Sequence, residues 1–198
     1  MYDLSYNLNE PDDVHTMMQK AVGMRPITVV EMDGGMVAKV SRVDFRDGTT
    51  MVAKHDPGAD AHLEIEAEML RNLRTPDVMR VPDVYFESRH LLVQEFIAGA
   101  HLEPAAREDA CRQLAALHEV TLPKAGLGST TLDGWIEIPS RWTDSWIEFF
   151  HDHRLRFAAD AALAACNLSV QHWDRAQLLA LRLDDLLVEA ESLLASAW

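Results

Sequence analysis

The chain has 198 residues, of which 48% are hydrophobic, and its formal net charge is -14. Length and composition are typical of one domain, or of two small lobes, with a sizeable core. The net negative charge argues against nucleic acid and anionic membranes as partners, because both would repel the chain. A nucleotide site is still compatible with this charge, because it needs only a few local charges and backbone amides.

The first half of the sequence predicts a helix, three strands, a second helix and two further strands. The expected elements are a helix over about 10–22, strands over 27–32, 36–43 and 49–54, a helix over 60–74, and a hairpin of strands over 84–87 and 91–97. Because strands and helices do not alternate, this order favours an antiparallel α+β lobe over a doubly wound sheet.

The second half changes character near residues 97–100 and is predicted to be mostly helical. The expected elements are a helix over 107–119 with Ala106, Ala110, Leu114 and Leu117 on one face, a loop over 123–141, a helix capped by Thr143, and a helix over about 175–196. We therefore expect a β-rich lobe over 1–97 and a helical lobe over 98–198.

One lysine and one glutamate form the most informative pair. Lys54 ends the third predicted strand, and Glu66 falls inside the apolar arc of the following helix. A carboxylate on the buried side of a helix is unfavourable unless a cation meets it. We therefore predict an ion pair between Lys54 and Glu66, of the kind that holds nucleotide phosphates in kinase folds. The alternative is that Glu66 extends to water at the edge of the arc.

Six stretches of the chain carry a resemblance to a known family. They are Gly34-Gly35, Val52-Ala53-Lys54, residues 63–73, residues 91–97, residues 113–118, and residues 142–150 with Arg154-Leu155. These stretches resemble the fructosamine kinases, which are related to the aminoglycoside phosphotransferases and have a protein-kinase-like fold. The Trp-Thr-Asp-Ser-Trp segment that begins at Trp142 is the most specific of them, and the resemblance extends over nearly the whole chain from about residue 25.

The resemblance implies an ATP-dependent small-molecule kinase with an antiparallel five-stranded lobe and a mostly helical lobe. In such a protein the backbone at Gly34 and Gly35 would approach the phosphates, Lys54 would contact them, and Glu66 would orient Lys54. The implied hinge consists of Glu95, Phe96 and Ile97. Its carbonyl at Glu95 and its amide at Ile97 would contact the adenine edge.

The resemblance also implies an acceptor site for a sugar or ketoamine hydroxyl. Trp142, Asp144 and Trp146 would contribute to it, as part of the signature segment. An aromatic stripe over 142–153 fits a wall of that site, but such rings more often belong to a core, and both interpretations stay open.

The catalytic segment that the resemblance implies has no match in the chain. The family supplies a catalytic Asp, an Asn and a metal-bridging Asp through His-Gly-Asp-Leu-Trp and Asp-Pro-Ala, and neither sequence is present. The nearest match, His172-Trp173-Asp174, is predicted to be a helix start capped by Asp174. We therefore assign no catalytic and no metal-binding residue, expect Mg²⁺ only in a complete family member, and expect this chain to be inactive alone. A fragment, a natural truncation and a binding-only relative all remain open.

His151-Asp152-His153 has a spacing that suggests a metal site. On a helix, however, residues i and i+2 point about 200° apart, so the two imidazoles are not expected to share an ion.

Three hypotheses for the function follow. The first is a kinase of the fructosamine kinase type, the second is a non-catalytic nucleotide-binding or protein-interaction module, and the third is a domain in which the Lys–Glu spacing is accidental. The leucines of the last helix are too widely spread for one buried stripe, which predicts an exposed face and a possible homodimer, unless Met17 and Met18 of the first helix cover it.

Cysteine content and hydropathy bear on location. Cys111 and Cys166 offer neither a disulfide framework nor a metal spacing, so we expect buried, reduced thiols. No signal peptide and no membrane span is recognised in the sequence, and we expect a cytoplasmic protein.

Overall fold

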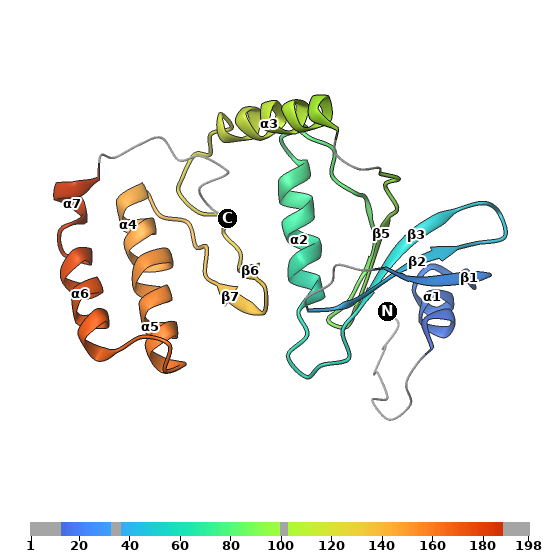
Figure 1. Cartoon of the computed structure of the whole chain (residues 1–198), viewed down its shortest axis with the longest axis horizontal. Coiled ribbons are helices and arrows are strands. Elements are labelled where there is room, and N and C mark those ends of the chain that lie inside the picture. The colour runs from blue at the N-terminus through green and yellow to red at the C-terminus, as the bar shows by residue number, and fades with distance from the viewer. Residues whose placement is uncertain (1–12, 33–36, 100–102, 188–198) are drawn as a thin grey trace. The chain divides into compact units, whose positions relative to one another are not determined.

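A five-stranded antiparallel sheet organises the first half of the chain (Figure 1). The computed structural model describes residues 13–32, 37–99 and 103–187. The chain divides into two units, residues 1–67 with 82–99 and residues 68–81 with 100–198. The predicted α+β class is confirmed.

The sheet has the strand order β1-β2-β3-β5-β4, and each neighbouring pair is antiparallel. Its strands are β1 Thr28–Met32, β2 Lys39–Asp44, β3 Thr50–His55, β4 Val84–Glu87 and β5 Leu91–Glu95. The β2–β3 turn forms where Asp47-Gly48 predicts it: Gly48 has a φ of 88°, and the Thr49 amide donates to Asp47 Oδ1 at 2.9 Å. The predicted β1–β2 turn at Gly34 and Gly35 lies outside the described residues.

Helix α1, Val14–Val22, covers one face of this sheet. Met17 and Met18 are 1% and 0% exposed and belong to the main core cluster. The sheet residues of that cluster are Val43, Phe45, Met51, Ala53, Leu91 and Val93. The alternative that α1 covers the leucines of the last helix is therefore wrong, because both methionines are used in the core of the first unit.

Helix α2, Leu63–Arg74, begins three residues later than its pattern predicts and buries Leu63 and Ala67. The loop before it is held by Arg89, whose guanidinium donates to the carbonyls of Ala59 at 2.6 Å and Ala61 at 2.9 Å. The loop is thereby tied to the segment that precedes β5.

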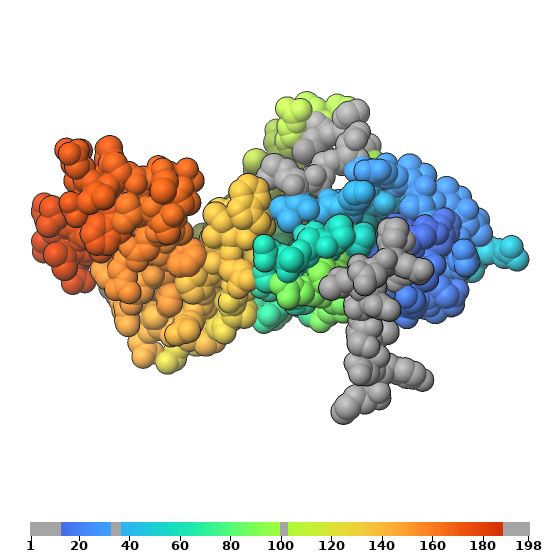
Figure 2. All heavy atoms as spheres, turned by 90° about the horizontal axis from the view of Figure 1, so that it is seen from below, coloured from blue at the N-terminus to red at the C-terminus, as the bar shows by residue number. Residues whose placement is uncertain are grey.

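The second unit is mostly helical. Its elements after α2 are α3 Pro104–His118, β6 Thr131–Asp133, β7 Ile136–Ile138, α4 Trp146–Phe150, a π-helix His151–Arg156, α5 Phe157–Ala164, α6 Val170–Ala180 and α7 Leu183–Leu186. The π-helix and α5 pack against α6, and these helices are drawn in orange to red in Figure 2. No helix in the described ranges is both long and apolar enough to cross a membrane.

Four local predictions in this unit are corrected. The expected loop over 123–141 contains the β6–β7 hairpin, which turns at Asp133-Gly134 with a φ of 62° at the glycine. Ser145, not Thr143, caps α4, because its Oγ accepts from the Glu148 amide at 3.1 Å. Ser169 caps α6, so Asp174 lies inside that helix, which ends at Ala180 instead of continuing to Ser196.

The apolar face predicted on α3 is not buried. Of its members only Leu117 is buried, whereas Leu114 is 49% exposed and Ala106 and Ala110 are exposed as well. The spacing is helical as predicted, but only the C-terminal end of this face, at Leu117, is buried.

Both cysteines are exposed, which corrects the expectation of buried thiols. Cys166 ends α5 in the left-handed conformation, with a φ of 59°. Its amide donates to the carbonyl of Leu163 at 3.0 Å, and the amide of Asn167 donates to the carbonyl of Ala162 at 2.8 Å. This hydrogen-bond pattern is a Schellman motif, which usually has glycine at the position that Cys166 occupies.

Candidate functional site

The predicted ion pair between Lys54 and Glu66 is present. Nζ of Lys54 on β3 donates to Oε1 of Glu66 on α2, and the two side chains are 24% and 29% exposed. The partly buried carboxylate therefore has the cationic partner that its place on the helix demands. Because Glu66 reaches Lys54 from α2, the start of α2 lies on the sheet face opposite to α1.

The strand register shows which side chains share the face of Lys54. Directly opposed residues of antiparallel strands, and alternate residues of one strand, point to the same face. Val52 precedes Lys54 by two positions and pairs with Arg42 on β2 and with Gln94 on β5. Arg42, Val52, Lys54 and Gln94 thus project from the face that α1 leaves uncovered.

A charged cluster lies at one end of this face. Arg42 donates to Asp44 Oδ1 at 2.9 and 3.0 Å, and Thr50 Oγ1 donates to the same oxygen at 2.8 Å. The hydrogen bond from Thr50, followed by the one from Arg42, holds the pKa of Asp44 below its usual range. The Arg42 guanidinium also stacks over the ring of Phe96, 5.0 Å from its centroid, so the cluster reaches the predicted hinge.

The predicted hinge follows directly from β5. Glu95 is the last residue of β5, and its amide donates to the carbonyl of Asp83 at 2.8 Å. The chain leaves the regular strand at Phe96, and Ile97 is 40% exposed. The hinge residues therefore lie at the end of the strand that carries Gln94 and next to the face that carries Lys54.

The predicted acceptor residues have separate environments in the second unit. Trp142 is 45% exposed and lies against Gly128, where an added Cβ would be 2.2 Å from the indole nitrogen. Asp144 is 85% exposed and pairs with Lys124 at 2.7 Å. Trp146 stacks on Phe149, with 5.7 Å between the ring centroids.

Phe149 is fully buried, so the aromatic stripe belongs to the core at this position. The stripe is not one continuous face, because α4 begins only at Trp146 and the π-helix then changes the helical period.

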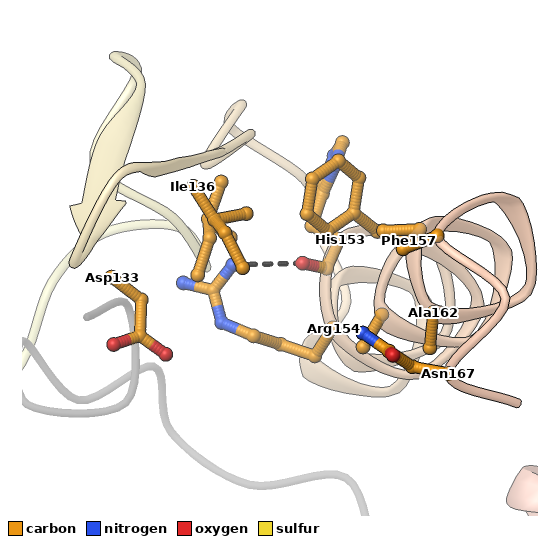
Figure 3. Close-up of a pocket in the computed structure, with 11 residues that line it drawn as sticks. Asp133, Ile136, His153, Arg154, Phe157, Ala162 and Asn167 are labelled. Atoms are coloured by element: carbon orange, nitrogen blue, oxygen red, sulfur yellow. Dashed lines mark hydrogen bonds between the residues drawn. The ribbon is translucent and has the colours of Figure 1, made fainter.

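A cavity of about 400 Å³ lies in the second unit between the β6–β7 hairpin and α5 (Figure 3). Ile136, Phe157 and several alanines make most of its wall apolar, while Asp133 and Arg154 add charge. The three predicted acceptor residues are not among those that line it. This cavity could not be predicted from the sequence, because the hairpin that forms one wall lies within the predicted loop.

Arg154 anchors one wall of the cavity. Its Nη1 donates to the carbonyls of Pro139 at 3.1 Å and His153 at 2.9 Å, the second being the dashed line in Figure 3. The guanidinium also lies 4.6 Å from the centroid of the Phe149 ring. Burial lowers the pKa of Arg154, and burial is also the largest cause that lowers the pKa of neighbouring His153.

His172, Trp173 and Asp174 lie within α6 and not in a loop. His172 Nδ1 is 2.8 Å from the hydroxyl of the capping Ser169, and Trp173 Nε1 donates to Asp160 Oδ1 at 2.7 Å. A helical backbone does not offer the loop geometry in which a catalytic aspartate of this type would act.

The two histidines of the metal-like spacing have different partners. His151 Nδ1 is 2.8 Å from Asp152 Oδ1, whereas the His153 ring packs on Phe149 with 5.5 Å between centroids. In the described part of the chain, no group of three His, Cys, Asp or Glu side chains could hold a metal ion.

The fold and the Lys–Glu pair place the chain in the class of protein-kinase-like folds, which combine this lysine on the third strand with a glutamate on the next helix. Within that class, the family model of fructosamine kinase matches residues 12–189. The chain therefore belongs to the fructosamine kinase family, as its motifs predict.

Two solved structures share the fold. A candidate fructosamine-3-kinase from Thermobifida fusca is 22% identical with a TM-score of 0.76, and the match covers 90% of this chain and 65% of that one. A candidate fructosamine-3-kinase from Haemophilus somnus is 18% identical with a TM-score of 0.70, and the match covers 90% of this chain and 63% of that one. The chain thus spans just under two thirds of the length of each. No curated protein matches it.

Proposed function

We propose that the first unit binds ATP on the sheet face that carries Lys54. Lys54 contacts the phosphates, Glu66 holds Lys54 in position, and the backbone at Glu95 and Ile97 contacts the adenine edge. The ion pair is the observation that carries this proposal, because it places a partly exposed cation on the sheet face opposite to α1, beside a segment that leaves the sheet. Gly34 and Gly35 complete the proposed site as the phosphate-facing turn.

In a complete family member, ATP bound in this way would phosphorylate a hydroxyl of a sugar or ketoamine. The γ-phosphoryl group would pass from ATP to the hydroxyl oxygen, with ADP as the leaving group and the hydroxyl proton lost to a base. Magnesium, carried by the nucleotide phosphates, would neutralise their charge. Trp142, Asp144 and Trp146 remain the proposed contacts for the acceptor.

We propose that a polypeptide of these 198 residues binds ATP but does not transfer its phosphate. The chain contains no His-Gly-Asp and no Asp-Pro-Ala sequence, and its nearest substitute lies in a helix. A non-catalytic nucleotide-binding module is the second candidate, favoured by the same observation. The unpaired cysteines fit a reducing compartment, and we propose the cytoplasm on that ground.

Calorimetric titration with MgATP tests the nucleotide site. Lys54→Met should weaken ATP binding by about 10- to 100-fold, because a charge-assisted contact with the phosphates is lost. Lys39→Met on neighbouring β2 is the matched control, since Lys39 is exposed and lies one strand away. Equal binding by wild type and Lys54→Met, with both folded, would rule out the proposed site.

A coupled assay of ADP release, with MgATP and a fructosamine, tests the proposed lack of transfer. We expect the wild-type chain to release no more ADP than Lys54→Met. Release that depends on the fructosamine and disappears in Lys54→Met would show that the chain is a working kinase.

A further inference from the structure

Gln94 is a polar residue in an otherwise buried strand. Leu91, Leu92 and Val93 precede it on β5 and are 2%, 0% and 0% exposed. Gln94 lies directly opposite Val52 on β3 and Val84 on β4. Its side chain therefore projects from the middle of the sheet on the face of Lys54, immediately before the proposed hinge.

The amide of Gln94 is incompletely paired. Its Oε1 is buried, and no described residue lies within hydrogen-bonding distance of it. A buried acceptor without a donor is destabilising, because it has lost its hydrogen bonds to water and forms none within the protein. A methionine or leucine would fit the apolar surroundings of β5 better, so the amide is explained most simply by a donor that arrives with a ligand.

We propose that Gln94 Oε1 accepts a hydrogen bond from the exocyclic amino group of a bound adenine and so favours ATP over nucleotides that lack this donor. This inference rests on the nucleotide site proposed above. Gln94 would thus contact the base through its side chain, whereas the proposed hinge contacts the base only through backbone groups.

The chemistry of adenine fits this position. The amino group carries two N–H bonds, and a hinge carbonyl at Glu95 can accept only one of them in the plane of the base. Gln94 is the residue before Glu95, on the face where the base would lie, and its Oε1 is the available acceptor for the second. A 6-oxo purine presents an acceptor at the same place, so the amide would have to turn over and present Nε2 in place of Oε1.

The opposite sheet face is not an alternative place for the base. It is filled by Met17 and Met18 of α1, which pack on Val43, Met51 and Val93. Helix α1 does not cover the face of Gln94. Val52 on that face is 7% exposed, but across the sheet the β1 residue Val30 is 50% exposed. A flat apolar base can therefore approach this face from its β1–β2 side and bring its polar edge toward Gln94.

Titrations of the 198-residue chain with three magnesium nucleotides test the inference. They are ATP, purine riboside 5′-triphosphate, which lacks the amino group, and ITP, which has an oxygen there. Wild type should bind ATP more tightly than either of the others, by about tenfold for each hydrogen bond that the amino group makes. Gln94→Met should bind ATP about tenfold more weakly than wild type and should bind purine riboside 5′-triphosphate unchanged, so that only the preference due to the Glu95 carbonyl remains.

The melting temperature without ligand provides a second readout. Gln94→Met should melt at the same temperature as wild type or higher, because it removes an unpaired acceptor and keeps the shape of the side chain. A purely structural role for Gln94 would instead lower it. Gln19→Met is the matched control in the same unit, since the exposed Gln19 amide donates to the carbonyl of Gly23 at 2.9 Å on α1, and it should leave nucleotide preference unchanged.

The outcomes separate this inference from the function on which it rests. If wild type binds none of the three nucleotides, the proposed nucleotide site is wrong and the role of Gln94 is wrong with it. If wild type binds all three equally, or if Gln94→Met keeps the full wild-type preference for ATP, the role of Gln94 is overturned while the nucleotide site stands.

Discussion

Removing both members of the ion pair between Lys54 and Glu66 should cost less stability than the sum of the two single changes. The variants are Lys54→Met, Glu66→Gln and the double variant. The side chains are 24% and 29% exposed, so the pair is neither a surface bridge nor a fully buried one. Two unit charges about 4 Å apart attract by about 4 kcal/mol at the effective dielectric of such a place, and desolvation and lost side-chain freedom offset much of this.

From these terms we expect each single change to lower the free energy of unfolding by about 1–3 kcal/mol. The double variant should fall short of their sum by about 1–2 kcal/mol, because neither charge is then left without its partner. Urea unfolding at low salt is the suitable assay, since guanidinium chloride would screen the pair. Molar sodium chloride should reduce the coupling, because the pair is partly exposed.

The pair between Glu108 and Arg112 on α3 is the matched control. Its side chains are 73% and 68% exposed, with 3.1 Å between Oε2 and Nη2, so its coupling should be only about 0.3–0.5 kcal/mol. Additive effects of Lys54→Met and Glu66→Gln, or a coupling no larger than this control, would refute the reasoning.

Three further predictions concern the second unit. Burial lowers the pKa of His153, so the folded chain binds a proton at this residue less readily than the unfolded chain does. The free energy of unfolding should therefore fall as the pH drops below about 6.5. In urea unfolding at several pH values, His153→Gln should reduce this dependence on pH. Cys166→Gly should raise the free energy of unfolding by about 1 kcal/mol, because glycine adopts the left-handed backbone without strain, and an unchanged midpoint would contradict this. Leu178 and Leu181 are 63% and 79% exposed, so the chain should self-associate at micromolar concentration, as measured by sedimentation. The double variant Leu178→Glu, Leu181→Glu should be monomeric. A wild-type monomer that binds no hydrophobic dye would exclude this self-association.

Most of the first unit could be predicted from the sequence because its signals are local. Alternating apolar residues identify the strands, the Asp47-Gly48 turn joins β2 to β3, and Gly23 ends α1 with a φ of 74°. The pairing of Lys54 with Glu66 could also be predicted, because a carboxylate in an apolar arc requires a cation nearby. The role proposed for Gln94 was missed, although one amide at the end of a buried apolar run was a visible signal.

The second unit was harder to predict because its elements are short or irregular. Each strand of the β6–β7 hairpin has only three residues, too few for alternation to be recognised. Thr143, Ser145 and Ser169 are all suitable caps, and only the backbone conformation decides which of them are used. The expectation of buried cysteines followed from general residue preference, which says nothing about how many segments surround a particular helix.

The π-helix carries one further consequence, for how this chain would respond to a change in its length. Its wider turns accommodate about one residue more than α-helical turns of the same length, as a single-residue insertion into a helix would. Deleting one residue between His151 and Arg156 would restore the regular period and leave Phe157 and the alanines of the cavity wall in place, because the wide turns already absorb the extra residue. The same deletion within the regular α5 would instead turn every later position by about 100° about the helix axis. A one-codon deletion in the π-helix would thus keep the cavity wall, and a one-codon deletion in α5 would rebuild it.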